Sequence, residues 1–166
     1  MYEATRTLET RPLRVDTPLM RTTGAALKRE VLLTPVLRAG LGMLDAARRI
    51  LPHTRVGFIG LKRDEATLAA TTYQASLPGN LRPLDVLLLD PMLATGGSAV
   101  AALNLLHERG ARHVRVVNLL GAPEGVRRVL KAFPDTAIFT AAVDKQLNTR
   151  GYILPGLGDA GDRLFG

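Results

Sequence analysis

The sequence VLLLDPMLATGGS, residues 86–98, carries an aliphatic run, an acid and a small-residue turn in that order. The aliphatic run is too short for a helix and indicates a strand buried on both faces, as in a parallel sheet. Asp90 would then stand at the carboxyl end of that strand, where ligands bind in open α/β sheets. Glycines let a phosphate approach the backbone, and a helix from about Ala99 would offer it unpaired N–H groups. The segment therefore predicts an α/β fold with an anion site at a strand end.

Two common nucleotide-binding loops do not fit this turn. A Walker loop has a lysine directly before its hydroxyl residue, whereas Gly97 precedes Ser98 here. The segment TGGSAV also lacks the G-x-G-x-x-G spacing of a dinucleotide-binding turn. A strand, an acid and then T-G-G-S is instead the form of a loop for phosphoribosyl pyrophosphate (PRPP), in which the acid holds ribose hydroxyls and the turn holds the 5′-phosphate. Taken alone, the segment also fits an ordinary glycine-containing connection between a strand and a helix.

Strands alternate with helices along most of the chain, which predicts a parallel sheet flanked by helices. The threonine-rich segment Ala66–Ala75 is expected to form a hairpin arm. No linker or repeat divides the sequence, so we expect one domain over residues 1–166 with its core at about 28–143. Strands are predicted at 31–37, 55–61, 84–89, 113–120 and 136–141, and helices at 41–51, 99–108 and 123–132.

The C-terminal segment, residues 144–166, breaks this alternation because it is rich in glycine. Such a composition argues against a regular helix or a central strand. A disordered tail and an ordered loop around a ligand remain as alternatives. Apolar residues such as Tyr152, Ile153 and Phe165 favour the ordered loop, since disordered tails are poorer in them. We call this segment the hood.

The composition limits the possible classes of function. The chain has no cysteine, which excludes disulfides, thiolate metal sites and cysteine nucleophiles. His53, His107 and His113 lack metal-ligand spacing and are interpreted as structural. No apolar run approaches a membrane span and the N-terminus lacks an apolar signal core, so a cytoplasmic location is expected. The net charge of +7 fits nucleic-acid binding, a small polyanionic substrate or a general richness in arginine.

Four segments together resemble the uracil phosphoribosyltransferase family, type I phosphoribosyltransferases that make UMP from uracil and PRPP. The DPMLATGGS loop and the hood ending are the most specific, and the resemblance extends over almost the whole chain. It implies the type I phosphoribosyltransferase fold, with a parallel core sheet flanked by helices, a hairpin arm and a loop-rich, uracil-binding hood. The four segments are TPVLRAGLG (34–42), GLKRD (60–64), DPMLATGGS (90–98) and GYILPGLGDAGDRLFG (151–166).

The resemblance also implies roles for individual residues. Arg38 and Arg63 would contact PRPP, although Lys62 replaces the tyrosine that usually precedes the second arginine. Asp159 would lie beside PRPP, directly or through Mg²⁺ and its waters. The implied PRPP-binding residues are Arg38, Arg63, Asp90, Pro91, Met92, Leu93, Ala94, Thr95, Gly96, Gly97, Ser98 and Asp159, and the implied uracil-binding residues are Ile153, Gly158, Asp159 and Ala160.

Cofactor and partners follow from the same resemblance. Mg²⁺ is the expected cofactor, bound mainly through PRPP, and no residue is assigned as the general base. The expected partners are uracil, PRPP, GTP as an activator and further copies of the chain in a homodimer or higher homo-oligomer, with neither a membrane nor a nucleic acid. Met1-Tyr2 matches an internal position of the family pattern. We therefore expect this form to lack the N-terminal helices that cover the core and contribute to subunit contacts in the family.

Two alternative functions stay open at this point. An RNA-binding regulator of pyrimidine operons is built on the same fold and would suit the positive charge, but such regulators lack the GLGDAGDRLFG ending. The other alternative is an inactive, shortened remnant that still binds PRPP.

Overall fold

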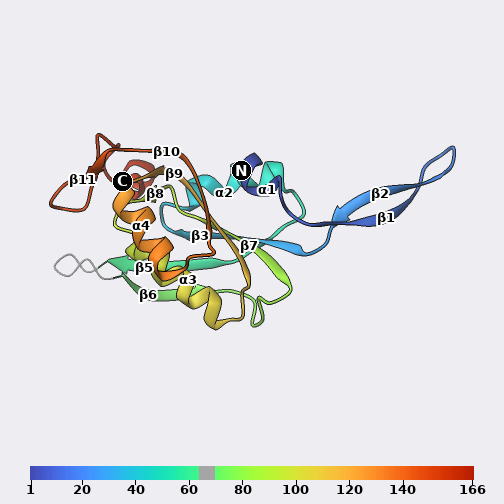
Figure 1. Cartoon of the computed structure of the whole chain (residues 1–166), viewed down its shortest axis with the longest axis horizontal. Coiled ribbons are helices and arrows are strands. Elements are labelled where there is room, and N and C mark those ends of the chain that lie inside the picture. Colours follow the sequence, from blue (N-terminus) through green and yellow to red (C-terminus); the bar gives the residue numbers. More distant parts are fainter. Residues whose placement is uncertain (64–69) are drawn as a thin grey trace.

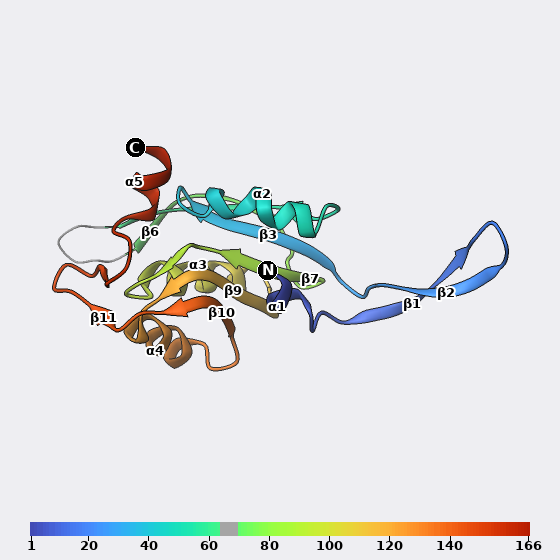
Figure 2. The same ribbon diagram turned by 90° about the horizontal axis from the view of Figure 1, so that it is seen from above.

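The structure, a computed structural model, describes residues 1–63 and 70–166 and consists of a central sheet with helices on both faces (Figure 1 and Figure 2). The described helices are α1 (Tyr2–Thr5), α2 (Leu41–Ile50), α3 (Gly97–Glu108), α4 (Pro123–Ala132) and α5 (Ala160–Phe165). The described strands are β1 (Thr10–Asp16), β2 (Arg21–Leu27), β3 (Glu30–Leu37), β4 (Arg55–Val56), β5 (Phe58–Arg63), β6 (Ala70–Ser76), β7 (Leu84–Leu89), β8 (Met92–Leu93), β9 (His113–Gly121), β10 (Ala137–Val143), β11 (Gln146–Leu147) and β12 (Ile153–Leu154). The predicted alternation of core strands and helices is confirmed.

The strand order of the main sheet determines where a ligand can bind. The order is β10-β9-β7-β3-β5-β6, in which β6 alone is antiparallel to its neighbour, and β4 and β8 add short pairings to β3 and β9. The chain therefore winds outward in both directions from the neighbouring strands β3 and β7. In open α/β sheets the ligand crevice lies at this reversal, outside the carboxyl ends of the two strands.

Strand β7 lies at the centre of the core and all six of its residues are buried. Val86 and Leu88 belong to the apolar cluster that includes residues of α3 and α4, whereas Leu87 and Leu89 belong to the cluster that includes residues of α1 and α2. This alternation confirms the predicted strand with two buried faces. The second cluster also contains Ala4 and Leu8, so the core extends beyond the limit at about residue 28 expected from the sequence.

The β1–β2 hairpin, which the sequence analysis did not predict, projects from the body at the end opposite the hood (Figure 1 and Figure 2). Its turn is closed by Thr17, whose N–H and hydroxyl both donate to the Met20 carbonyl, at 3.2 and 2.7 Å. The Thr17-Pro18 pair is the turn signal that could have located it. Of the hairpin arm that was predicted, β6 confirms the part from Ala70 onward by pairing with β5, and residues 66–69 lie outside the described residues.

The hood is an ordered structure, as expected, but it contains a helix that was not expected. Strands β11 and β12 form a small antiparallel hairpin, and the glycine-rich part that follows has left-handed backbone at Gly156 and Gly158. Helix α5 begins only after these glycines, and Asp159 caps it by accepting a hydrogen bond from the Asp162 N–H at 3.0 Å. The prediction that residues 144–166 contain no regular helix is therefore wrong for 160–165, because Gly151, Gly156 and Gly158 precede the cap and α5 itself contains only Gly161.

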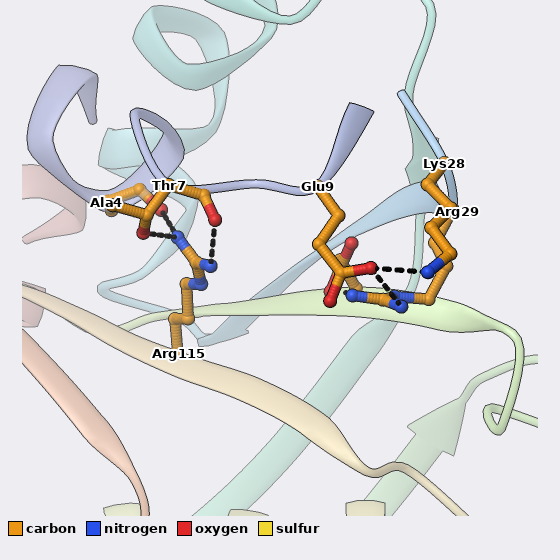
Figure 3. Close-up of polar contacts among 7 residues, drawn as sticks. Ala4, Thr7, Glu9, Lys28, Arg29 and Arg115 are labelled. Atoms are coloured by element: carbon orange, nitrogen blue, oxygen red, sulfur yellow. Dashed lines mark hydrogen bonds and ion pairs between the residues drawn. The ribbon is translucent and has the colours of Figure 1, made fainter. Parts of the chain in front are cut away.

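A chain of charges fixes the base of the β1–β2 hairpin to the core (Figure 3). The Glu9 carboxylate accepts a hydrogen bond from Lys28 Nζ at 2.7 Å and one from Arg29 Nη1 at 3.4 Å. Arg29 Nε also lies 3.2 Å from the carboxylate of Asp85, which is buried at the start of β7. Hydrogen bonds from Lys28 and then Arg29, together with their charges, lower the pKa of Glu9 to about 2.

A second arginine holds the N-terminal helix (Figure 3). Arg115 of β9 donates to the Ala4 carbonyl at 2.6 Å and to both the hydroxyl and the carbonyl of Thr7, at 3.0 and 3.2 Å. These bonds satisfy carbonyls at the end of the short helix α1, where no helical donor follows.

We predict that acid releases the base of the hairpin. Because the folded pKa of Glu9 lies below its ordinary value of 4.5, the stabilisation from this carboxylate is complete above about pH 4.5 and is lost as the pH falls through about 2. An NMR titration of the Glu9 carboxyl carbon should have its midpoint near pH 2, and Lys28→Met should raise that midpoint toward the ordinary value. A wild-type midpoint above pH 4 would contradict the charge network at this base.

Candidate functional site

The backbone of β9 supports residues 90–98, here called the phosphate loop, before its turn begins. The Asp90 N–H donates to the Val117 carbonyl at 3.2 Å, and the Pro91 carbonyl accepts from the N–H groups of Leu119 and Leu120, both at 3.0 Å. Strand β8 then pairs with the end of β9. Pro91 and Leu93, both predicted to bind PRPP, are buried here. These two residues therefore lie beneath the turn and support it.

Asp90 lies at the end of β7, as the sequence predicted. Its Oδ1 accepts a hydrogen bond from the Met92 N–H at 3.3 Å, and its carbonyl accepts one from Nδ2 of Asn118 at 2.6 Å. Asn118 is only 3% exposed, and it was missed by the sequence analysis. A single amide within the otherwise apolar second half of β9, residues 116–121, was the available signal, because buried polar side chains need partners.

The turn of the phosphate loop is built around Gly96. Its φ of 76° is left-handed, which glycine adopts readily, and α3 begins at Gly97. Gly96 has no side chain to cap the helix, and the Gly97 N–H donates to the Thr95 hydroxyl at 3.5 Å. The first turn of this 12-residue helix thus presents N–H groups and the positive end of its dipole to the site.

Arg38 lies on the loop that follows β3, next to the phosphate loop. A Cβ on Gly40 would lie 2.5 Å from the Leu89 carbonyl oxygen, so this loop packs directly against the end of β7. The guanidinium of Arg38 is 4.0 Å from Asp162 of α5, and both side chains are mostly exposed. Exposed ion pairs of this kind contribute about 0–1 kcal/mol, so Arg38 can exchange Asp162 for a phosphate at little cost.

The hood residues predicted to bind uracil lie in two different environments. Ile153 is 2% exposed and Ala160 is 8% exposed, so both pack inside the hood. Gly158 and Asp159 are exposed, and Gly158 has a φ of 81°. The end of the hood rests on the first turn of α2, directly after the Arg38 loop, since a Cβ on Gly42 would lie 2.6 Å from Leu164 Cδ1.

Arg63 is the last residue of β5, which runs parallel to β3 and so ends at the same edge of the sheet. The prediction for its side chain lies outside the described residues. The structure therefore brings together three of the four predicted segments, residues 34–42, 90–98 and 151–166. The described backbone of the remaining segment, residues 60–63, ends beside them.

Other kinds of site are limited within the described residues. They contain no group of three or more His, Asp or Glu side chains that could hold a metal ion. His107 stacks on Phe133 at 5.0 Å, in agreement with a structural role. Among the described helices, none is both long and apolar enough to cross a membrane.

A large hollow lies away from the turn of the phosphate loop. It has a volume of about 840 Å³ and is bounded by α1, α2 and residues within β9 and β10, with Met43, Leu119 and Phe139 in its lining. The lining is mainly apolar and Glu3 is its only charged side chain among the described residues, so it does not suit a phosphorylated substrate.

Known proteins resemble this chain over nearly its full length. A model of the uracil phosphoribosyltransferase family matches residues 1–166. The uracil phosphoribosyltransferase of Kineococcus radiotolerans is 55% identical over 169 aligned positions, covering 99% of this chain and 80% of that protein. That of Acholeplasma laidlawii is 50% identical over 165 residues, covering 99% and 79%. None of these matches supports the RNA-binding regulator or the inactive remnant.

Solved structures show the same relationship. A protein from Aquifex aeolicus has a TM-score of 0.94 at 41% identity, with 99% of this chain and 79% of that chain covered. A hypoxanthine phosphoribosyltransferase from Staphylococcus aureus has a TM-score of 0.56 at 18% identity, with 72% of this chain and 64% of that chain covered. The second likeness shows the type I phosphoribosyltransferase fold that was expected.

We predict that Gly96→Ala destabilises the protein more than Gly110→Ala does. Both glycines have a positive φ, which costs an alanine about 1–2 kcal/mol. In addition, a Cβ on Gly96 would lie 2.8 Å from the Gly125 carbonyl oxygen, whereas a Cβ on Gly110 would meet nothing closer than 3.6 Å. Urea denaturation should show a further loss of about 1 kcal/mol or more for Gly96→Ala. Equal losses in the two variants would disprove this packing of the loop.

Proposed function

Because this chain belongs to the uracil phosphoribosyltransferase family, we propose that it transfers the phosphoribosyl group of PRPP to uracil, giving UMP and pyrophosphate in pyrimidine salvage. One observation carries the proposal for the site. A glycine turn at the start of α3 follows an acid at the end of β7, at the point where the winding of the sheet reverses.

PRPP carries two separate anionic groups, and the site offers a different kind of partner for each. The N–H groups at the start of α3 suit the 5′-phosphate, and Asp90 suits the ribose hydroxyls. Arg38 suits the pyrophosphate, because its planar guanidinium can form paired, charge-assisted hydrogen bonds. We propose the same role for Arg63 at the end of β5.

Uracil is uncharged and presents amide-like edges, which backbone groups can recognise. The exposed backbone at Gly158 and Asp159 supplies such groups, and Ile153 and Ala160 supply the apolar support beneath them. A base with a reversed hydrogen-bonding edge, such as cytosine, would leave a polar group unpaired at a cost of about 1–3 kcal/mol.

In the reaction, the bond between ribose C1 and the pyrophosphate oxygen breaks, and a bond between C1 and uracil N1 forms. The pyrophosphate leaves with the bonding electron pair, and the N1 proton of uracil is released. The residues act by orienting the two substrates and by holding the departing charge on Arg38, with no protein nucleophile. Mg²⁺ would be held by PRPP with Asp159 as the candidate carboxylate, and it would neutralise phosphate charge.

Two further features complete the proposal. The exposed apolar residues of the β1–β2 hairpin, Leu13, Leu19 and Met20, suit contact with another subunit in a homodimer or higher homo-oligomer. Light scattering of the purified protein measures that assembly.

We also propose GTP as an activator. This is tested by comparing the rate of UMP formation with and without GTP.

The activity has a direct test. Purified protein with Mg²⁺ and PRPP should convert labelled uracil to UMP with release of pyrophosphate, and it should leave cytosine unchanged. Absence of UMP in this assay would contradict the proposed function for this chain.

A second test separates the two roles of Asp159. Asp159→Asn removes the charge but keeps a good helix cap, so turnover should fall by about tenfold or more while stability changes little. Asp159→Ala should lower turnover equally and also lose about 1 kcal/mol of stability, because the bond to the Asp162 N–H disappears. Kinetics and urea denaturation on the two variants measure this, and wild-type turnover in Asp159→Asn would exclude Asp159 from the site.

A further inference from the structure

The first turn of α4 packs against the phosphate loop more closely than any side chain would permit. A Cβ on Gly125 would collide with the Ala94 carbonyl oxygen and would lie 2.9 Å from the Leu93 carbonyl oxygen. Glycine within a helix is disfavoured relative to alanine by about 1 kcal/mol, so helix formation does not explain its presence. The contact with Ala94 does, because only glycine allows the two backbones to approach this far.

The same turn of α4 also holds the hood. Glu124 Oε1 accepts a hydrogen bond from the N–H of Leu147 in β11 at 3.2 Å. Next to it, the Asp144 N–H donates to the Gly121 carbonyl at 2.8 Å, and Asp144 Oδ2 accepts from the Gly156 N–H at 3.0 Å. The hood is therefore attached through its backbone to the last residue of β9 and the first turn of α4.

The attached residue Leu147 is close to one of the residues expected to bind uracil. Leu147 is the register partner of Ile153 across the β11–β12 hairpin. A shift of Leu147 would therefore move the residue expected to support uracil. On the other side, Ala94 directly precedes Thr95 and Gly96 in the turn that is expected to hold the 5′-phosphate.

We propose that Glu124 and Gly125 are positioning residues that fix the distance between the PRPP-binding loop and the uracil-binding hood. This inference rests on the proposed function. Two consecutive residues of one helical turn contact the two halves of the site, Gly125 the phosphate loop and Glu124 the hood. Ribose C1 and uracil N1 come from different halves of the site and must meet within bonding range. A rigid spacer between the halves supplies this alignment, and a misplacement of about 1 Å is enough to slow such reactions.

Glu124 is tested by a pair of substitutions. Glu124→Ala should raise the KM for uracil about tenfold, since the Leu147 N–H loses its acceptor, while the KM for PRPP stays within about twofold. Glu124→Gln keeps an oxygen at the same place and should restore the uracil KM to within about threefold of wild type. Glu108→Ala, an exposed acid at the end of α3, serves as the matched control and should leave both constants unchanged.

Gly125 is tested by the opposite kinetic pattern. Gly125→Ala should raise the KM for PRPP about tenfold or more, because the added Cβ displaces the Ala94 carbonyl and the turn after it. Gly79→Ala is the control, since a Cβ there meets no atom within 4 Å. Binding of ribose 5-phosphate by calorimetry gives a second measure that does not require turnover, and it should weaken in Gly125→Ala alone.

The outcomes separate this inference from the proposed function. Hydrogen exchange of residues 144–157 should accelerate in Glu124→Ala and not in Glu124→Gln or Glu108→Ala, whether or not the enzyme turns over. An active wild type whose Glu124→Ala and Gly125→Ala variants change both KM values in equal proportion would overturn the positioning role. So would unchanged hydrogen exchange in Glu124→Ala. A folded wild type that forms no UMP overturns the proposed function instead.

Discussion

The close backbone contact between the phosphate loop and the elements after β9 is the constraint on which the site depends. Residues 90–93 are held along the end of β9 by the hydrogen bonds to the Pro91 carbonyl and by the pairing of β8 with β9. The turn that follows packs against α4 at Gly125. No side chain intervenes at these contacts, so their geometry is fixed by backbone dimensions. A loop held in this way can keep the N–H groups at the start of α3 in place before any anion arrives, which lowers the entropic cost of binding.

The charged groups of the chain divide into two sets with different effects. At the base of the β1–β2 hairpin, Glu9, Lys28, Arg29 and Asp85 pair with one another, and their charges are largely used within the fold. At the carboxyl edge of the sheet, the one ion pair of Arg38 with a described residue is its long, exposed contact with Asp162. The net charge of +7 therefore says little about function by itself. What matters is that one weakly engaged guanidinium lies beside the phosphate loop.

Particular residues show how much of the fold the sequence predicts. The aliphatic run Val86–Leu89 indicated a strand with two buried faces, and Pro123 at the start of its helix located α4 at its observed bounds. The β1–β2 hairpin was missed because all of β1 is exposed, and the apolar alternation that marks a strand packed on a core is confined to its last four residues, 13–16. Helix α5 was missed because the glycine content of the hood outweighed the single cap at Asp159.

In the candidate site, too, some features were predictable from the sequence and others were visible only in the tertiary structure. The local order of strand, acid, glycine turn and helix determined where Asp90 and Gly96 lie, because each of these features depends only on neighbours in the chain. The sequence also placed Arg38 and Asp159 on segments expected at one sheet edge. Only the tertiary structure showed that Asn118 bonds to Asp90, that Gly125 packs on the phosphate loop and that Glu124 bonds to the hood, because those contacts join residues far apart in the chain. A helix with a glycine in its first turn is an unremarkable pattern until a carbonyl oxygen of another loop occupies the space that a side chain would need.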